Sequence, residues 1–158
     1  SDIDLENRTI SISKNYNRLV DLVGSPKSKA GVRTISIDKK TVNMLRLYKN
    51  RQQQLYVESG VSVSSVVFAI PTKEYQNMAT RQDALDRRCA EISIPRFTFH
   101  AFRHTHASLL LNAGISYKEL QYRLGHATLA MTMDIYSHLS ADKEKEAVSY
   151  YEKAINSL

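Results

Sequence analysis

The sequence lacks the features that mark membrane, secreted and fibrous proteins. No stretch approaches the roughly eighteen uninterrupted apolar residues of a membrane-spanning helix, and acidic residues near the start take the place of a basic leader. With Cys89 as the single cysteine, no internal disulfide can form, which favours a reducing compartment. Repeats and low-complexity segments are also absent. We therefore expect an ordinary globular protein of the cytoplasm with no membrane partner.

The composition fits one domain with an excess of positive charge. The 158 residues are 42% hydrophobic and 24% charged, which is enough to bury a core. Lysine and arginine number 22 against 16 aspartate and glutamate, giving a formal net charge of +6. This excess predicts a polyanionic partner such as nucleic acid, although charge by itself does not identify one.

The first forty residues indicate a small antiparallel sheet. Residues 8–13 and 32–37 alternate polar and apolar side chains, with many β-branched residues, as half-buried strands do. The apolar run at 19–23 predicts a middle strand between them. The segment 24–31 is rich in Gly, Ser, Pro and Lys, so we expect a basic hairpin tip there.

Helical patterns dominate the remainder of the chain. Asp38 is a candidate N-cap for a first helix, Cys89 lies in a second helical pattern, and Pro95 ends that pattern. The predicted helices after the first span residues 72–91, 98–114, 116–125, 128–137 and 140–158. The predicted fold class is α+β, mostly α, with a three-stranded antiparallel sheet followed by a helical bundle.

Side chains suited to a phosphodiester are concentrated in the second half of the chain. His100 and Arg103 are three residues apart and share one face of their predicted helix. His126 follows a predicted helix end, and Tyr136 lies ten residues later. Short helices and glycine turns allow these residues to fold back on one another. Arg103 offers a planar fork of donors to two phosphate oxygens, His126 a further donor, and His100 an acid or base.

Tyr136 is the candidate nucleophile. A free tyrosine has a pKa of about 10, so its hydroxyl needs neighbouring positive charge and a bound phosphate to become reactive. Lys29 or Lys27, in the basic hairpin tip, is the candidate proton donor to the departing sugar oxygen. No cofactor or metal is expected, since these cationic side chains supply the charge that a metal ion otherwise would.

These motifs resemble those of the tyrosine recombinases, the phage-integrase family. The resemblance rests on residues 100–107 (HAFRHTHA), 124–126 (LGH) and 136–138 (YSH), in that order, with a lysine segment, 28–33 (SKAGVR), upstream. It covers nearly the whole chain and is closest to integrases of phages and conjugative elements of Gram-positive bacteria. The family pattern points to Lys29, with Lys27 as its neighbour.

The resemblance implies site-specific integration or excision of a mobile element. Tyr136 would attack a phosphate of double-stranded DNA, form a 3′-phosphotyrosine and free a 5′-hydroxyl, within a homo-tetramer that assembles on attachment sites. A type IB topoisomerase shares this chemistry. The alternative from another class is a basic DNA-binding module without catalysis.

One part of the family pattern has no counterpart in this sequence. The family has an earlier catalytic arginine before its first strand, and the chain opens at Asp2 about where that segment ends. Arg33 is no substitute, because it follows the hairpin lysine in a strand pattern. We therefore expect residues 1–158 to be a single catalytic domain, truncated at its N-terminus and inactive by itself.

Further basic residues are candidates for DNA contact, namely Lys27, Arg96, His104 and His138. His104 follows His100 by four residues, which suggests a zinc site at first sight. The Glu of a His-Glu-x-x-His zinc motif is replaced by Ala101, so structural or DNA-facing roles are favoured.

Overall fold

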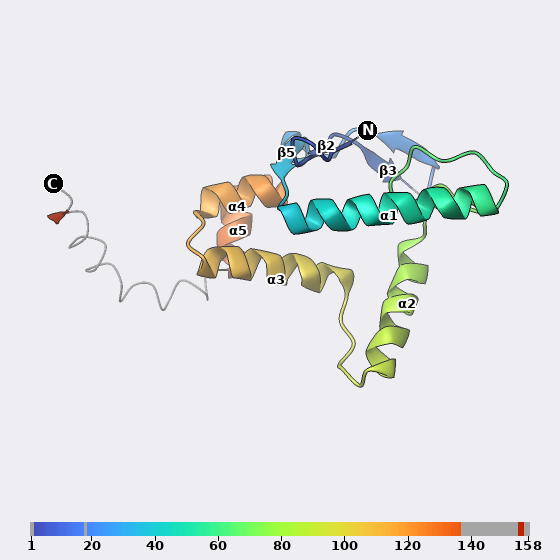
Figure 1. Cartoon of the computed structure of the whole chain (residues 1–158). Helices are drawn as coiled ribbons and strands as arrows, with labels where there is room; N and C mark the ends of the chain where they lie inside the picture. The colour runs from blue at the N-terminus through green and yellow to red at the C-terminus, as the bar shows by residue number, and fades with distance from the viewer. Residues whose placement is uncertain (1, 18, 137–154, 157–158) are drawn as a thin grey trace. The chain divides into compact units, whose positions relative to one another are not determined.

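The computed structural model describes residues 2–17, 19–136 and 155–156 (Figure 1). The chain forms two compact units, one built from residues 1–12 and 34–101 and the other from residues 13–33 and 102–158. The predicted helix at 140–158 lies outside the described residues, apart from 155–156. No helix in the described ranges is long and apolar enough to cross a membrane.

A three-stranded sheet forms near the N-terminus, in the order β1 (Ile3–Asp4), β2 (Thr9–Ile12), β5 (Arg33–Ser36). β1 and β2 are antiparallel, with Ile3 opposite Ile10. The tight turn between them is closed by Asp4, whose carboxylate accepts a 2.8 Å hydrogen bond from the amide of Asn7. The predicted strands at 8–13 and 32–37 are confirmed in this sheet.

The predicted middle strand at 19–23 is wrong. β3 (Asn15–Asn17) and β4 (Leu22–Gly24) form a separate two-stranded antiparallel sheet, and residues 19–21 lie in the turn before β4. Asp21 takes a positive φ of 51° there and accepts a 2.6 Å hydrogen bond from the hydroxyl of Tyr16. Leu19 is 89% exposed, whereas a residue of a central strand is packed on its neighbours. The prediction was wrong because it took the apolar character of this run as a sign of burial.

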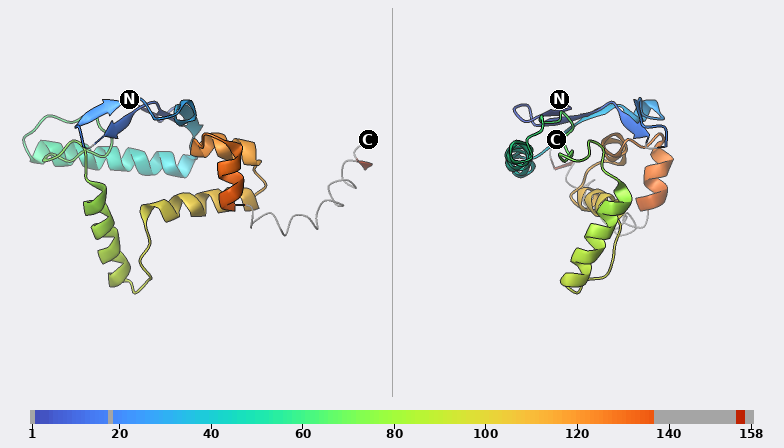
Figure 2. Two further views of the ribbon diagram at one scale, coloured as in Figure 1. Left: turned by 180° about the vertical axis from the view of Figure 1, so that it is seen from behind. Right: turned by 90° about the vertical axis from the view of Figure 1, so that its right-hand side faces the viewer.

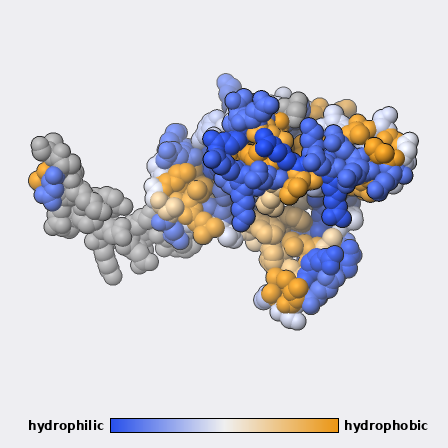
Figure 3. Space-filling model, in the orientation of Figure 1, coloured by the Kyte–Doolittle hydropathy of each residue, from blue (hydrophilic) through white to orange (hydrophobic). Residues whose placement is uncertain are grey.

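Two helices complete the first unit. α1 (Lys39–Glu58) begins at the predicted N-cap, where the Asp38 carboxylate accepts a 3.0 Å bond from the amide of Thr41. α2 (Met78–Glu91) begins six residues later than predicted, because Asn77 caps it, and it buries Cys89 as expected. In Figure 3 the visible surface of α1 is mostly polar, whereas apolar residues gather near the C-terminal end of α2.

Three helices form the core of the second unit, namely α3 (Phe99–Asn112), α4 (Tyr117–Leu124) and α5 (Leu129–Tyr136). The predicted capping box at the start of α4 is present, with Ser116 and Glu119 each bonding the other's backbone amide. α4 ends at Gly125, which is left-handed with φ 72°. The buried side chains that join these helices are Ala107, Leu111, Leu120, Leu124 and Tyr136. The three helices are visible from two further directions in Figure 2.

Candidate active site

Arg103 is fixed by the end of another helix. It lies on α3, half-buried, and its Nη2 donates a 2.6 Å hydrogen bond to the carbonyl oxygen of Leu124, the last residue of α4. The last carbonyls of a helix have no partner within the helix and carry its negative dipole end, so a guanidinium is favoured there. This bond uses one of the five N–H donors of the side chain.

His126 is held by contacts on several sides. It is 8% exposed, and its Nδ1 lies 2.9 Å from the hydroxyl oxygen of Thr132, which is fully buried on α5. Its amide donates to the carbonyl of Gln121, whose side-chain amide in turn donates to the carbonyl of His126. Because Nδ1 is engaged with Thr132, a hydrogen bond from His126 to a phosphate would come from Nε2.

Tyr136, the last residue of α5, is held at both ends. Its hydroxyl oxygen lies 3.1 Å from Nδ1 of His104, and its backbone carbonyl accepts a 3.2 Å bond from the hydroxyl of Tyr117. The side chain is 2% exposed. Burial raises the pKa of the phenol, and the positive charge of Arg103 opposes that rise. Tyr136 is therefore protonated at neutral pH in this arrangement.

The lysine segment is a tight turn and not the tip of a two-stranded hairpin, because β4 and β5 belong to different sheets. Lys29 begins a short 3₁₀ turn (Lys29–Gly31), and both Lys29 and Lys27 are exposed. This turn approaches the end of α4, since a Cβ added at Gly125 would lie 3.1 Å from the carbonyl oxygen of Ala30.

Three of the predicted site residues are therefore linked within the second unit. Arg103 bonds to Leu124, two residues before His126; His126 contacts α5 through Thr132; and α5 carries Tyr136. The sequence pointed to Arg103, His126 and the 124–126 motif, but not to their partner on α5. His104, which contacts the Tyr136 hydroxyl, was expected to have a structural or DNA-facing role, and no sequence pattern pointed to Thr132.

The remaining candidates lie elsewhere or are untested. His100 is exposed on the first turn of α3, three residues before Arg103 on the same helix. Arg96 is exposed and bonded to the Asp86 carboxylate. Hydrogen bonds from the side chains of Gln82, the larger effect, and of Arg96 both lower the pKa of Asp86. His138 lies outside the described residues. Contact with DNA by Lys27, Arg96, His104 and His138 stays a prediction.

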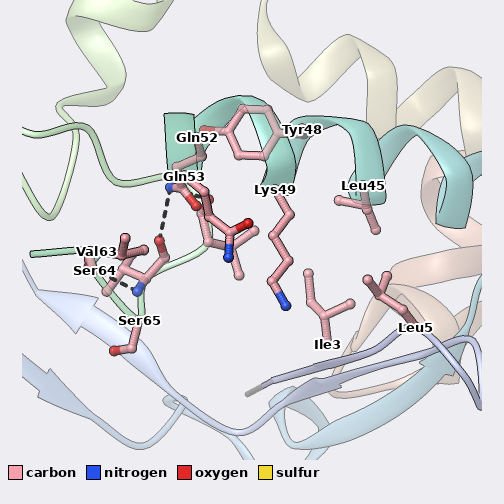
Figure 4. A pocket seen from close by; sticks show the side chains of 12 residues that line it. Ile3, Leu5, Leu45, Tyr48, Lys49, Gln52, Gln53, Val63, Ser64 and Ser65 are labelled. Atoms are coloured by element: carbon pink, nitrogen blue, oxygen red, sulfur yellow. Dashed lines mark hydrogen bonds between the residues drawn. The ribbon is translucent and has the colours of Figure 1, made fainter. Parts of the chain in front are cut away.

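A pocket in the first unit contains none of these residues (Figure 4). It lies between α1 and the segment 63–67, with Lys49 extending from α1 toward Ile3. The Gln52 side chain closes one end by donating to the carbonyls of Val67 and Ala69, at 2.9 and 2.8 Å. Within the described part of the chain, no group of three or more His, Cys, Asp and Glu side chains could hold a metal ion.

Comparison with known proteins decides the family. Residues 1–143 match the model of the phage integrase family. The chain belongs to this family. It is 33% identical over 129 residues to the ICEBs1 integrase of Bacillus subtilis (strain 168), covering 79% of this chain and 34% of that protein. It is 30% identical over 152 residues to the transposase of transposon Tn916 of Enterococcus faecalis, covering 89% and 37%. The resemblance seen in the motifs is confirmed.

A solved structure shows the same fold. The Tn1549 transposon integrase, in complex with circular intermediate DNA, matches with a TM-score of 0.75 and 24% identity, over 95% of this chain and 52% of that one. The mostly α fold with a small antiparallel sheet is therefore that of the catalytic part of tyrosine recombinases. The chain spans about a third of the length of the two curated relatives above.

Proposed function

We propose that this chain is the catalytic segment of a tyrosine recombinase that cuts and rejoins DNA strands during integration or excision of a mobile element. The observation that carries the proposal is the contact between the hydroxyl of the buried Tyr136 and Nδ1 of His104. His104 is the neighbour of Arg103 on α3. A phenol held beside an arginine that is itself anchored on the turn leading to His126 is an arrangement suited to attack on a phosphate.

The reaction follows from the roles of these groups. The Tyr136 oxygen attacks the phosphorus, the bond from phosphorus to the 5′ oxygen breaks, and a 3′-phosphotyrosine forms. Lys29 gives a proton to the departing 5′ oxygen, while Arg103 and His126 neutralise the charge on the non-bridging oxygens. Attack by a 5′-hydroxyl from a partner strand reverses the step and reseals the DNA.

The phenol proton needs an acceptor. His104 Nδ1, at 3.1 Å from the Tyr136 oxygen, is in hydrogen-bond range of that proton. The exposed His100, one turn earlier on α3, is the acid–base group that the motifs suggest, and it acts on the bound phosphate. The two histidines therefore have separable roles.

The segment works within a longer recombinase that supplies the family's earlier arginine and further DNA-binding surface. Its partners are double-stranded attachment sites and three further copies of the recombinase in a synaptic tetramer. The net charge of +6 supports a DNA partner, as does the DNA complex of the structurally similar Tn1549 integrase. Alone, the segment is inactive in cleavage.

A DNA-binding module without catalysis is the rival function. A nicked suicide substrate separates the two, because loss of the short downstream strand traps a covalent protein–DNA product. We expect the full-length recombinase to form this product and residues 1–158 alone to bind the same DNA without forming it. Binding without covalent product by the full-length protein would favour the rival.

A further inference from the structure

Arg33 bonds to two backbone segments that are far apart in the sequence. It is half-buried at the start of β5, and its Nη1 donates a 3.0 Å hydrogen bond to the carbonyl of Gly31, at the end of the Lys29 turn. Its Nε donates a 3.0 Å bond to the carbonyl of Arg123, ninety positions along the chain. One guanidinium therefore joins the lysine turn to the end of α4.

The carbonyl that accepts the hydrogen bond from Arg33 Nε is adjacent in the chain to the one that accepts from Arg103. Arg123 and Leu124 end α4, and their two carbonyls are satisfied by the two arginines from other elements. The planar fork of Arg33 suits this bridging, because two of its donors reach different acceptors from one rigid group. A lysine ammonium lacks this planar fork, so it cannot hold the Gly31 and Arg123 carbonyls in one fixed geometry.

Gly125 shows how closely Arg33 is packed. A Cβ added at Gly125 would overlap the Arg33 guanidinium, with the central carbon at 2.7 Å. Glycine is favoured there by its positive φ of 72°, and a side chain at this position would displace the Arg33 guanidinium. Burial, together with the charge of Arg103, lowers the pKa of Arg33, as expected for a guanidinium set among protein groups.

We propose that Arg33 is a positioning residue of the recombinase, which fixes the Lys29 turn against the Gly125–His126 turn. The inference rests on the proposed function, in which Lys29 protonates the 5′ oxygen of the same phosphate that His126 contacts. Arg33 touches neither the phosphate nor the sugar in this account. It sets the distance between the proton donor and the phosphate ligands by holding their two backbone turns together.

The test uses two variants in the full-length recombinase and one matched control. Arg33→Met keeps the length and the apolar stem of the side chain but removes both hydrogen bonds. Arg33→Lys keeps the charge and removes the fork, and serves if Arg33→Met fails to fold. Arg46→Met, at an exposed position on α1, controls for the loss of one positive charge.

The first readout compares suicide substrates with an ordinary 5′ oxygen and with a 5′-bridging sulfur, which leaves without a proton. We expect Arg33 variants to lose about 10²-fold in cleavage of the oxygen substrate, the scale of a misplaced catalytic group, and clearly less on the sulfur substrate. Arg46→Met should resemble the wild type on both. An equal loss on both substrates, or no loss, would overturn the inference.

The second readout does not depend on activity. Backbone hydrogen exchange should rise in Arg33→Met in both turns, residues 28–32 and 123–127, and in neither turn in Arg46→Met. A rise in one turn only, or in none, overturns the positioning role even if cleavage changes. A wild type that forms no covalent product would instead refute the proposed function, and exchange alone would then decide whether Arg33 couples the turns.

Discussion

The hydroxyl oxygen of Tyr136 lies 3.1 Å from Nδ1 of His104, and the two rings are tilted with centroids 5.8 Å apart. The residues are thirty-two positions apart, on α5 and α3. The phenol is therefore held by a neighbour of Arg103 and buried from water. In the proposed reaction, this contact makes His104 the acceptor of the phenol proton, a role that its sequence position does not reveal.

Replacing His104 by phenylalanine tests that place. His104→Phe keeps an aromatic ring against Tyr136 but removes the nitrogen that can take the phenol proton. We expect slower formation of the covalent product, by about 10²-fold, the lower range for loss of a positioned proton acceptor. Single-turnover cleavage of a suicide substrate measures it. If His104→Phe slows cleavage by less than about threefold, far short of the expected loss, then His104 has only a packing role.

Lys29→Ala should affect departure of the 5′ oxygen and leave the attack itself intact. Cleavage of the ordinary substrate should fall, and a 5′-bridging sulfur should restore it, because a thiolate leaves without a proton. Lys27→Ala is the matched control, since Lys27 is exposed in the same loop. If the sulfur substrate rescues Lys27→Ala and not Lys29→Ala, then Lys27 is the proton donor.

Thr132→Val tests the buried contact that orients His126. The substitution keeps the shape of the side chain but removes the hydroxyl oxygen 2.9 Å from Nδ1. An unsatisfied buried polar group costs about 1–3 kcal/mol, so the free energy of unfolding should fall by that amount. Denaturant unfolding of residues 1–158 measures it, with the exposed Thr72→Val as control. Equal stability of the two variants would show that the hydroxyl is dispensable.

We expect stability to depend on pH through His106. Its Nε2 accepts a 2.9 Å bond from Nε of Arg123, and burial, together with the charge of Arg123, lowers its pKa. The folded state therefore favours the neutral ring. This contribution is fully present above the ordinary pKa of about 6.5 and is lost as the pH falls through the lowered folded value.

We therefore expect the free energy of unfolding of residues 1–158 to fall between pH 8 and pH 5.5, about the ordinary histidine range. The fall should be smaller in His106→Gln, which cannot take up that proton. Urea unfolding at the two pH values measures both differences. The same fall in wild type and variant would mean that His106 does not contribute.

Local signals in the sequence predicted much of the fold. Helix starts at Asp38 and Ser116 and the helix end at Gly125 follow from bonds within four residues, which a sequence displays directly. The strand error arose at 19–23, because the pairing of an apolar run depends on what lies beside it. Leu22 pairs with Asn17 across a tight turn and not with either predicted neighbour.

The sequence suggested candidate site residues but not the contacts that hold them. Arg103, His126 and Tyr136 belong to motifs whose residue types already suit a phosphate. The contacts around these residues include Arg33 to Arg123 and His104 to Tyr136, across ninety and thirty-two positions. No periodicity reports contacts of that range, and Arg33 in particular is concealed within an ordinary strand pattern.

Tyr136 is the proposed nucleophile of a DNA-cleaving recombinase. Full-length protein is trapped on a nicked suicide substrate and digested with protease, and the peptide attached to DNA is sequenced by mass spectrometry. We expect a 3′-phosphotyrosine at Tyr136, and no covalent product from Tyr136→Phe, whose DNA binding stays near that of the wild type. A product attached to another tyrosine, or one that persists in Tyr136→Phe, would refute the assignment of Tyr136 as nucleophile.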